Sequence, residues 1–208
     1  MATAPPRRRY APRLPRAERH RQVLDVTLAL IAADGYAGVT MERVAREAGV
    51  TKPVVYACFP GKDELFRALL RREEQRAIAE LAAVLRRPDT NEDPDELLVE
   101  VVVGFLEVVL ANPKAWRLIL LPTEGTPTIV REHVGRGRTE VARAIEALVA
   151  WGIGTRGGPA VDVEIAAQAI LTLAEGAGRM VLTHPERYTP ERIGSFTRSV
   201  IGALARSP

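Results

Sequence analysis

The stretch VTMERVAREAGVTKPVVYACFPGKDELF, residues 39–66, decides the fold. Thr40 can cap a helix whose apolar residues recur at helical spacing for about two turns, and Gly49 ends that helix. A second short helix can begin at Thr51, with Pro53 in its first turn, where a missing N–H is harmless. Two short helices joined by a turn that contains a small residue and a glycine are the arrangement of a helix-turn-helix.

The second of these helices has an outer face that suits a DNA major groove. Its residues on that face are Lys52, Val54, Tyr56, Ala57 and Cys58. Lys52 and the Thr51 hydroxyl lie at the helix start, where they and the free backbone amides can meet a phosphate. Tyr56 adds a flat apolar ring with a hydroxyl. The pattern predicts a helix that recognises DNA.

Residues 39–66 closely resemble the DNA-binding signature of TetR-family transcriptional regulators. The matching positions are Thr40, Ala48 to Val50, Lys52, Tyr56, Phe59 and Lys62. The resemblance covers residues 16–70, about a quarter of the chain. The sequence departs from the family pattern at Cys58, where a histidine or aromatic residue is common, and at Val54, where a polar residue is common. Apolar Val54 favours contact with thymine methyls, which makes readout of DNA shape more important.

The resemblance and the motif together give a set of candidate DNA contacts. They are Thr40, Arg43, Thr51, Lys52, Val54, Tyr56, Cys58 and Lys62. One helix-turn-helix contacts few bases, so we expect a homodimer that reads a palindromic double-stranded operator.

The N-terminal part of the chain is basic. Residues 1–60 hold ten basic and five acidic residues, whereas the whole chain has a formal net charge of only +3. Residues 1–15 contain four prolines and four arginines and no acid, so we expect a disordered basic arm that can reach DNA. Residues 16–62 then form the predicted DNA-binding domain, whose first helix spans residues 16–33.

The rest of the chain reads as helices, so the expected fold is all-α with about nine helices. Residues 63–208 form the expected ligand-binding and dimerisation domain. Its glycine-rich residues 152–159 predict a break between helices. The expected helices span residues 63–86, 95–111, 113–121, 128–151, 161–183 and 190–206.

The family resemblance implies a small-molecule cavity between the long helices, whose occupation moves the DNA-binding domains apart. We expect an effector that is apolar or acyl-like, because few aromatic residues are present to enclose a large cation. Candidate lining residues are Phe105, Val109, Trp116, Leu120, Gln168, Thr172 and Glu175. Gln168 and Thr172 are the strongest candidates for inward polar contacts, because they lie four residues apart on an otherwise apolar helix.

The last two helices predict a dimer interface. The first is rich in small residues, which allow close approach of helices, and the second carries an apolar stripe that needs a partner. Packing within one chain is the alternative. The candidate interface residues are Ala169, Leu173, Ile193, Phe196, Val200 and Leu204.

Several classes of protein are disfavoured. No local motif of an enzyme is present, and neither a cofactor nor a metal site is expected. The single cysteine excludes an internal disulfide. Residues 97–111, the longest apolar stretch, are interrupted by Glu100 and Glu107, so we expect neither a transmembrane protein nor a membrane partner. With no secretory signal visible, we expect a cytoplasmic protein. The predicted function is a ligand-released repressor, and the alternative is a helical protein-interaction module without sequence-specific DNA binding.

Overall fold

The computed structural model describes residues 14–86, 88, 89, 91–121, 126–156 and 161–204, and the side chain of Leu204 lies outside that description. Within these residues the fold is all-α, as predicted: nine α-helices, one short 3-10 helix (η1) and no strand. The basic arm predicted for residues 1–15 falls almost wholly outside the described part. The elements are α1 (Arg16–Asp34), η1 (Tyr36–Gly38), α2 (Met41–Glu47), α3 (Lys52–Cys58), α4 (Lys62–Val84), α5 (Pro94–Ala111), α6 (Pro113–Leu120), α7 (Thr128–Arg156), α8 (Val163–Thr183) and α9 (Pro190–Leu204).

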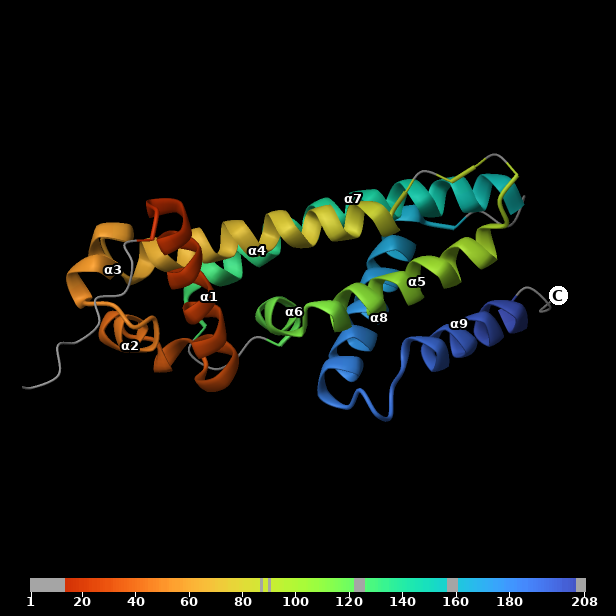
Figure 1. Cartoon of the computed structure of the whole chain (residues 1–208). Helices are drawn as coiled ribbons and strands as arrows, with labels where there is room; N and C mark the ends of the chain where they lie inside the picture. The colour runs from red at the N-terminus through yellow and green to blue at the C-terminus, as the bar shows by residue number, and fades with distance from the viewer. Residues whose placement is uncertain (1–13, 87, 90, 122–125, 157–160, 205–208) are drawn as a thin grey trace, which may run out of the picture.

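The molecule is elongated, with α1, α2 and α3 at one end and α5, α8 and α9 at the other (Figure 1). An N-terminal core joins α1, α2, α3 and the first turns of α4 around fully buried Val23, Val44 and Val55. Leu118 of α6 and Val130 of α7 belong to the same core. The two ends of the molecule are therefore connected by packing as well as by α4.

The C-terminal part is a bundle built around α5. Figure 1 shows α4 and α7 running side by side along one edge and α9 lying along α5. One core joins α4, α5, α6 and α8 around Leu106, Val109 and Val181, none of which is exposed. A smaller core joins α7 and α8 through Ala142, Ile145, Ala167 and Leu171.

The predicted break at residues 152–159 begins too early. Helix α7 continues through Gly152 and Gly154 to Arg156. Gly152 is buried, and a Cβ there would lie 3.4 Å from the Pro94 side chain of α5, so tertiary packing outweighs the low helix propensity of glycine. Residues 157–160 lie outside the described part. The next helix begins at Val163, because Asp162 caps it by accepting a hydrogen bond from Ile165 N at 3.1 Å.

Candidate nucleic-acid interface and cavity

The turn between α2 and α3 is fixed by its backbone and by α1. Gly49 has a φ of +64°, in the left-handed region that favours glycine. Val50 N donates to Ala45 O at 2.9 Å, which closes the turn. From α1, the Gln22 side chain donates to Ala48 O at 3.0 Å. The relative orientation of the two short helices is thereby set within the domain.

Helix α3 is anchored on one side and open on the other. Val55 is fully buried, and the Phe59 ring packs 4.8 Å from the ring of His20 on α1. Tyr56, on the opposite side, is 41% exposed. Thr51 is exposed at the N-cap position, and its side chain makes no capping hydrogen bond. The Tyr56 ring and the Thr51 hydroxyl are therefore both exposed on a helix that the core holds in place.

Lys52 carries the positive charge of this surface. It is exposed and forms an ion pair with Glu42 of α2, and its Nζ lies 5.7 Å from the centre of the Tyr56 ring. The hydrogen bond from Lys52 lowers the pKa of Glu42, and the same bond raises the pKa of Lys52. Both groups are charged at neutral pH, so a DNA phosphate that binds Lys52 must compete with Glu42.

Thr40 and Arg43 are engaged inside the domain. The Thr40 hydroxyl accepts a hydrogen bond from Arg43 N at 3.1 Å and so caps α2. The Arg43 guanidinium donates to Gly38 O at 3.1 Å and pairs with Asp34 of α1. The Thr40 cap confirms the prediction, whereas the contacts of the Arg43 side chain, which hold α2 against the end of α1, were not indicated by the sequence motif.

The remaining predicted contacts lie at the edges of the surface. Val54 is half-buried. Cys58 is also half-buried and packs against the N-terminal core, and burial raises the pKa of its thiol. Lys62 begins α4, with its Nζ 5.4 Å from the centre of the Phe66 ring. The expectation that Cys58 belongs to the outer face therefore needs correction, because its side chain turns partly inward at the end of α3.

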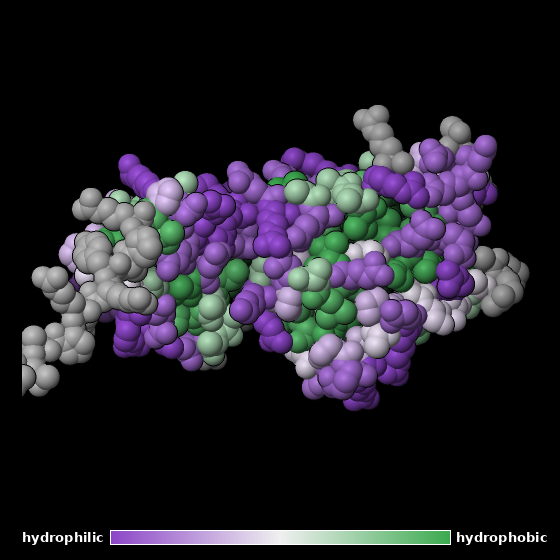
Figure 2. Space-filling model, viewed as in Figure 1, coloured by the Kyte–Doolittle hydropathy of each residue, from purple (hydrophilic) through white to green (hydrophobic). Residues whose placement is uncertain are grey.

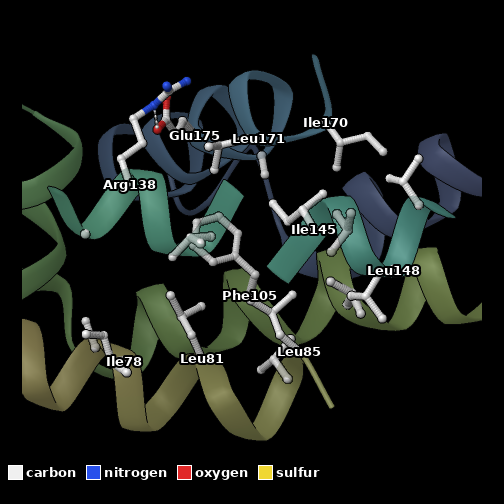
Figure 3. A pocket seen from close by; sticks show the side chains of 18 of the residues that line it. Ile78, Leu81, Leu85, Phe105, Arg138, Ile145, Leu148, Ile170, Leu171 and Glu175 are labelled. Atoms are coloured by element: carbon white, nitrogen blue, oxygen red, sulfur yellow. Dashed lines mark hydrogen bonds and ion pairs between the residues drawn. The ribbon is translucent and has the colours of Figure 1, made fainter. Parts of the chain in front are cut away.

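A cavity of about 520 Å³ lies between α4, α5, α7 and α8 (Figure 3). The lining includes Leu81 of α4, Leu85 at the C-cap of α4, Phe105 of α5, Ile145 of α7 and Leu171 of α8. Exposed Ile78 also lines it, so the cavity reaches the surface beside α4, and Figure 2 shows apolar side chains at the surface between α4 and α5. The volume falls in the usual range for small-molecule pockets.

The polar residues of the lining are contributed by α4, α7 and α8. Arg138 Nε donates to Glu175 Oε1 at 2.7 Å, and Figure 3 shows this pair at the cavity wall. His133 Nε2 lies 2.6 Å from Glu74 Oε2. Glu73, only 3% exposed, and Arg156, which pairs with Asp95, also line the cavity. Sequence reasoning missed Glu73, Glu74 and Arg138, because charged residues on an amphipathic helix are usually solvated.

The predicted lining residues divide into two groups. Four of them line the cavity: Phe105, Trp116, Leu120 and Glu175. Val109 is fully buried in the neighbouring core, and Gln168 accepts a hydrogen bond from Arg138 at 3.3 Å without lining the cavity. Thr172 is exposed and donates to Gln168 O at 2.7 Å. The expectation for Thr172 is corrected, since α8 turns Ala167, Leu171 and Gly178 inward instead.

Helices α8 and α9 carry a large exposed apolar face. Leu173 is 74% exposed and Phe196 67%, and Ala169 and Val200 are exposed beside them. Ile193 departs from the predicted interface, because it is half-buried against the chain's own core. Helix α8 is also long and apolar enough, by length and composition alone, to cross a membrane, with only 28% of its most apolar window buried. Its outer face therefore needs a cover.

No cluster of three or more His, Cys, Asp or Glu residues that could hold a metal ion occurs in the described residues.

Comparison with known proteins identifies the N-terminal part first. The family model for "Bacterial regulatory proteins, tetR family" matches residues 23–69. The nucleoid occlusion factor SlmA of Actinobacillus pleuropneumoniae (serotype 5b, strain L20) is 33% identical over 49% of this chain and 50% of its own length. The transcriptional activator FasR of Mycolicibacterium smegmatis is 34% identical over 51% and 48%, respectively. The chain spans about half the length of these curated relatives.

Solved structures match over nearly the whole chain. A TetR-like transcriptional regulator from Rhodococcus sp. RHA1 superimposes with a TM-score of 0.73 and 25% identity, covering 94% of this chain and 100% of that one. The regulator FadR from Bacillus subtilis, in complex with stearoyl-CoA, gives a TM-score of 0.69 at 16% identity, covering 87% and 96%. The second likeness is one of fold alone.

Proposed function

Because the chain belongs to the tetR family of bacterial regulatory proteins, we propose that it is a DNA-binding repressor released from its operator by a small apolar ligand. The observation that carries this proposal is the double role of α4. Leu70 belongs to the N-terminal core and also lines the cavity, and the residues of α4 beyond it line the cavity as far as Leu85. A ligand that displaces α4 therefore moves the DNA-binding domain.

The mechanism has two states. In the DNA-bound state of the proposed homodimer, the two α3 helices lie about 34–36 Å apart and enter successive major grooves. A ligand that binds a different position of α4 more tightly shifts the population away from that spacing. A coupling of roughly 1–3 kcal/mol between the two sites is typical of such proteins.

The contents of the cavity are proposed from its lining and from one structural neighbour. The walls are almost entirely aliphatic and aromatic, which suits a hydrocarbon chain. FadR from Bacillus subtilis was solved with stearoyl-CoA, whose acyl group is such a chain. We therefore propose an apolar or acyl-like effector and no cofactor.

A homodimer accounts for the exposed face of α8 and α9. Exposed apolar patches of this kind mark interaction sites, and a second copy of the chain supplies the second DNA-binding domain that a palindromic operator requires. Leu173 and Phe196 stand at the centre of this proposed interface, with Ala169 and Val200 beside them. Residues 16–62 and 63–208 are proposed as the DNA-binding and the ligand-binding and dimerisation domains of a cytoplasmic regulator.

Binding to DNA tests the proposal directly. Purified protein is titrated against a labelled duplex from upstream of its own gene and against a scrambled duplex, across a salt series. We expect a preference for the upstream duplex that survives near-physiological salt. Weak and equal binding to both duplexes would favour the alternative, a helical interaction module without sequence-specific DNA binding.

Variants of α3 test the assignment of the surface. We expect Lys52→Ala and Tyr56→Ala each to weaken operator binding by about 1–3 kcal/mol, with the Lys52 variant also reducing the salt slope by about 1. Lys114→Ala, which removes the same charge from an exposed position on α6, is the control and leaves affinity unchanged. Unchanged affinity in both α3 variants would show that α3 is not the recognition helix.

The sign of regulation is tested with a reporter gene downstream of the operator. We expect deletion of the regulator to raise expression. The relative FasR is named an activator, so a fall in expression would assign that role here instead.

A further inference from the structure

One carboxylate in the cavity wall lacks a partner on one oxygen. Glu73 is 3% exposed, and its Oε1 accepts a hydrogen bond from Arg72 Nε at 2.7 Å. Its Oε2 is buried and accepts no hydrogen bond from any residue in the described part of the chain. Such groups are rare in folded proteins, and leaving one without a hydrogen bond costs free energy.

The unpartnered oxygen belongs to a residue that lines the cavity, whose wall is mostly apolar. We propose that Glu73 recognises a hydrogen-bond donor, a hydroxyl or an ammonium group, at the end of the apolar ligand. This inference rests on the proposed function and adds the chemistry of the ligand's head group. An ester, thioester or ether head group offers no such donor to Glu73.

The cavity is long in one direction, which favours a linear ligand. Its lining on α4 runs from Leu70 to Leu85, which is roughly 22 Å at 1.5 Å per residue. Glu73 lies near the end of this run that is closer to the DNA-binding domain. A chain that places its donor on Glu73 extends its tail along α4 toward Leu85.

Glu73 already has an ionic partner in Arg72, which favours a hydrogen bond from the ligand over a second full ion pair. Arg72 pairs with Glu73 at 2.6 Å, and at the same wall Arg138 pairs with Glu175. A neutral hydroxyl satisfies Oε2 without adding an uncompensated charge to a water-poor site. An ammonium group offers the same donor, and Glu74, which pairs with His133, lines the same cavity.

Arg72 connects this oxygen site to the DNA-binding domain. The same guanidinium that holds Glu73 donates from NH1 to Asp25 Oδ1 of α1 at 2.7 Å. A donor bound at Oε2 contacts the same carboxylate whose Oε1 holds Arg72, and so adjoins the link between α4 and α1. The ligand's head group is therefore recognised at the point where α4 meets the N-terminal core.

The test uses two ligands whose head-group oxygen carries a proton in one and a methyl group in the other. Dodecanol carries a donor, whereas dodecyl methyl ether has the same chain and an oxygen that only accepts. Both tryptophans of the chain, Trp116 and Trp151, line the cavity, so intrinsic fluorescence reports ligand entry. We expect the full-length protein to bind dodecanol about tenfold or more tightly than the ether, and dodecylamine to behave like the alcohol.

Glu73→Gln tests the residue. The amide keeps the shape of the side chain but can place an N–H where Oε2 stood, so we expect the preference for alcohol over ether to vanish or reverse. Glu80→Gln is the matched control, since its carboxylate lies on the same helix but outside the cavity lining and is paired with Arg76; it keeps the preference. Thermal unfolding of both variants verifies that each is folded. If Glu73→Gln does not fold, Glu73→Asp, which keeps the carboxylate, is tested in its place.

The outcomes separate this inference from the function on which it rests. Equal affinity of the wild-type protein for alcohol and ether, with both releasing the operator, overturns the role of Glu73 and leaves the repressor proposal standing. Failure of all three ligands to change the fluorescence overturns the inference. Loss of operator preference in the DNA titration, by contrast, contradicts the proposed function itself.

Discussion

Tyr36 places a phenol hydroxyl in the N-terminal core, where the described residues give it no hydrogen-bond partner. Burial raises the pKa of Tyr36 to about 12. In the unfolded chain the phenol ionises near pH 10. Between about pH 10 and about pH 12 the unfolded state has lost a proton that the folded state keeps, so this group makes stability fall as the pH rises.

We expect Tyr36→Phe to remove that part of the alkaline loss of stability. At neutral pH the change in stability should stay within about 1 kcal/mol, because no partner is left unsatisfied and the edge contact with Phe66 is retained. Denaturant unfolding of both proteins across the alkaline range measures the difference. Tyr56→Phe, at a 41% exposed position, is the control and should keep the wild-type slope. An alkaline slope in Tyr36→Phe as steep as in the wild type would contradict the assignment.

The sequence indicated which residues lie on an exposed face, but not which contacts each side chain makes in the fold. The spacing of Thr51, Lys52 and Tyr56 was sufficient to locate an exposed face. It could not reveal that Arg43 is held by Asp34, because that pairing needs the fold to bring α1 beside α2. Glu73 was missed for the same reason: a glutamate in a charged run on a long helix is usually solvated, and only the packing of α4 buries it.

Helices α5 and α9 approach each other closely at Gly194 of α9. A Cβ on Gly194 of α9 would lie 2.5 Å from Val103 Cγ2 of α5. Valine is stiff at χ1 in a helix, so it cannot move aside freely. We expect Gly194→Ala to destabilise the protein by roughly 1 kcal/mol, because overpacking of about 1–3 kcal/mol exceeds the gain in helix propensity of about 1 kcal/mol.

Gly135→Ala is the matched substitution for that prediction. Gly135 is exposed on α7, and a Cβ there would meet no atom within 4 Å. We expect it to stabilise the protein by about 0.5–1 kcal/mol. Thermal unfolding distinguishes the two variants, and an equal shift of the midpoint in the same direction would show that close packing at Gly194 does not limit stability.

Helical periodicity was enough to predict the order of the elements but not every end or face. Helix α7 passes Gly152 because Pro94 packs against it, and no local signal reports that contact. Helix α8 is apolar on most of its circumference, so its sequence alone could not decide which side faces inward. The sequence predicted an inward polar contact for Thr172. The packing of α8 against α5 and α7 leaves Thr172 exposed instead.

In the whole molecule, α4 connects the N-terminal core to the C-terminal core. Helix α4 contributes Leu65, Phe66 and Leu69 to the N-terminal core and Ala77 and Leu81 to the C-terminal one. The sequence predicted a helix over residues 63–86, but not that Leu118 and Val130 from the middle of the chain would join the N-terminal core. In the proposed mechanism, movement of α4 is therefore transmitted through these packed side chains to the N-terminal core.

The exposed apolar side chains of α8 and α9 predict that the protein associates through these two helices. We expect the wild-type protein to have twice the 22.7 kDa chain mass by light scattering, and the double variant Leu173→Glu, Phe196→Glu to have the single-chain mass. Charges at the centre of an apolar interface must be desolvated on association, which opposes it. Because a dimer gains avidity from two half-sites, the variant should bind the operator about 100-fold more weakly or worse.

The control adds the same two charges elsewhere. Ala79→Glu, Ala82→Glu places them on exposed positions of α4, and it should remain dimeric with unchanged operator binding. Circular dichroism verifies that both double variants keep their helices. A Leu173→Glu, Phe196→Glu protein that stays dimeric would exclude this face as the interface, since two unpaired carboxylates cannot be buried there without a large loss of affinity.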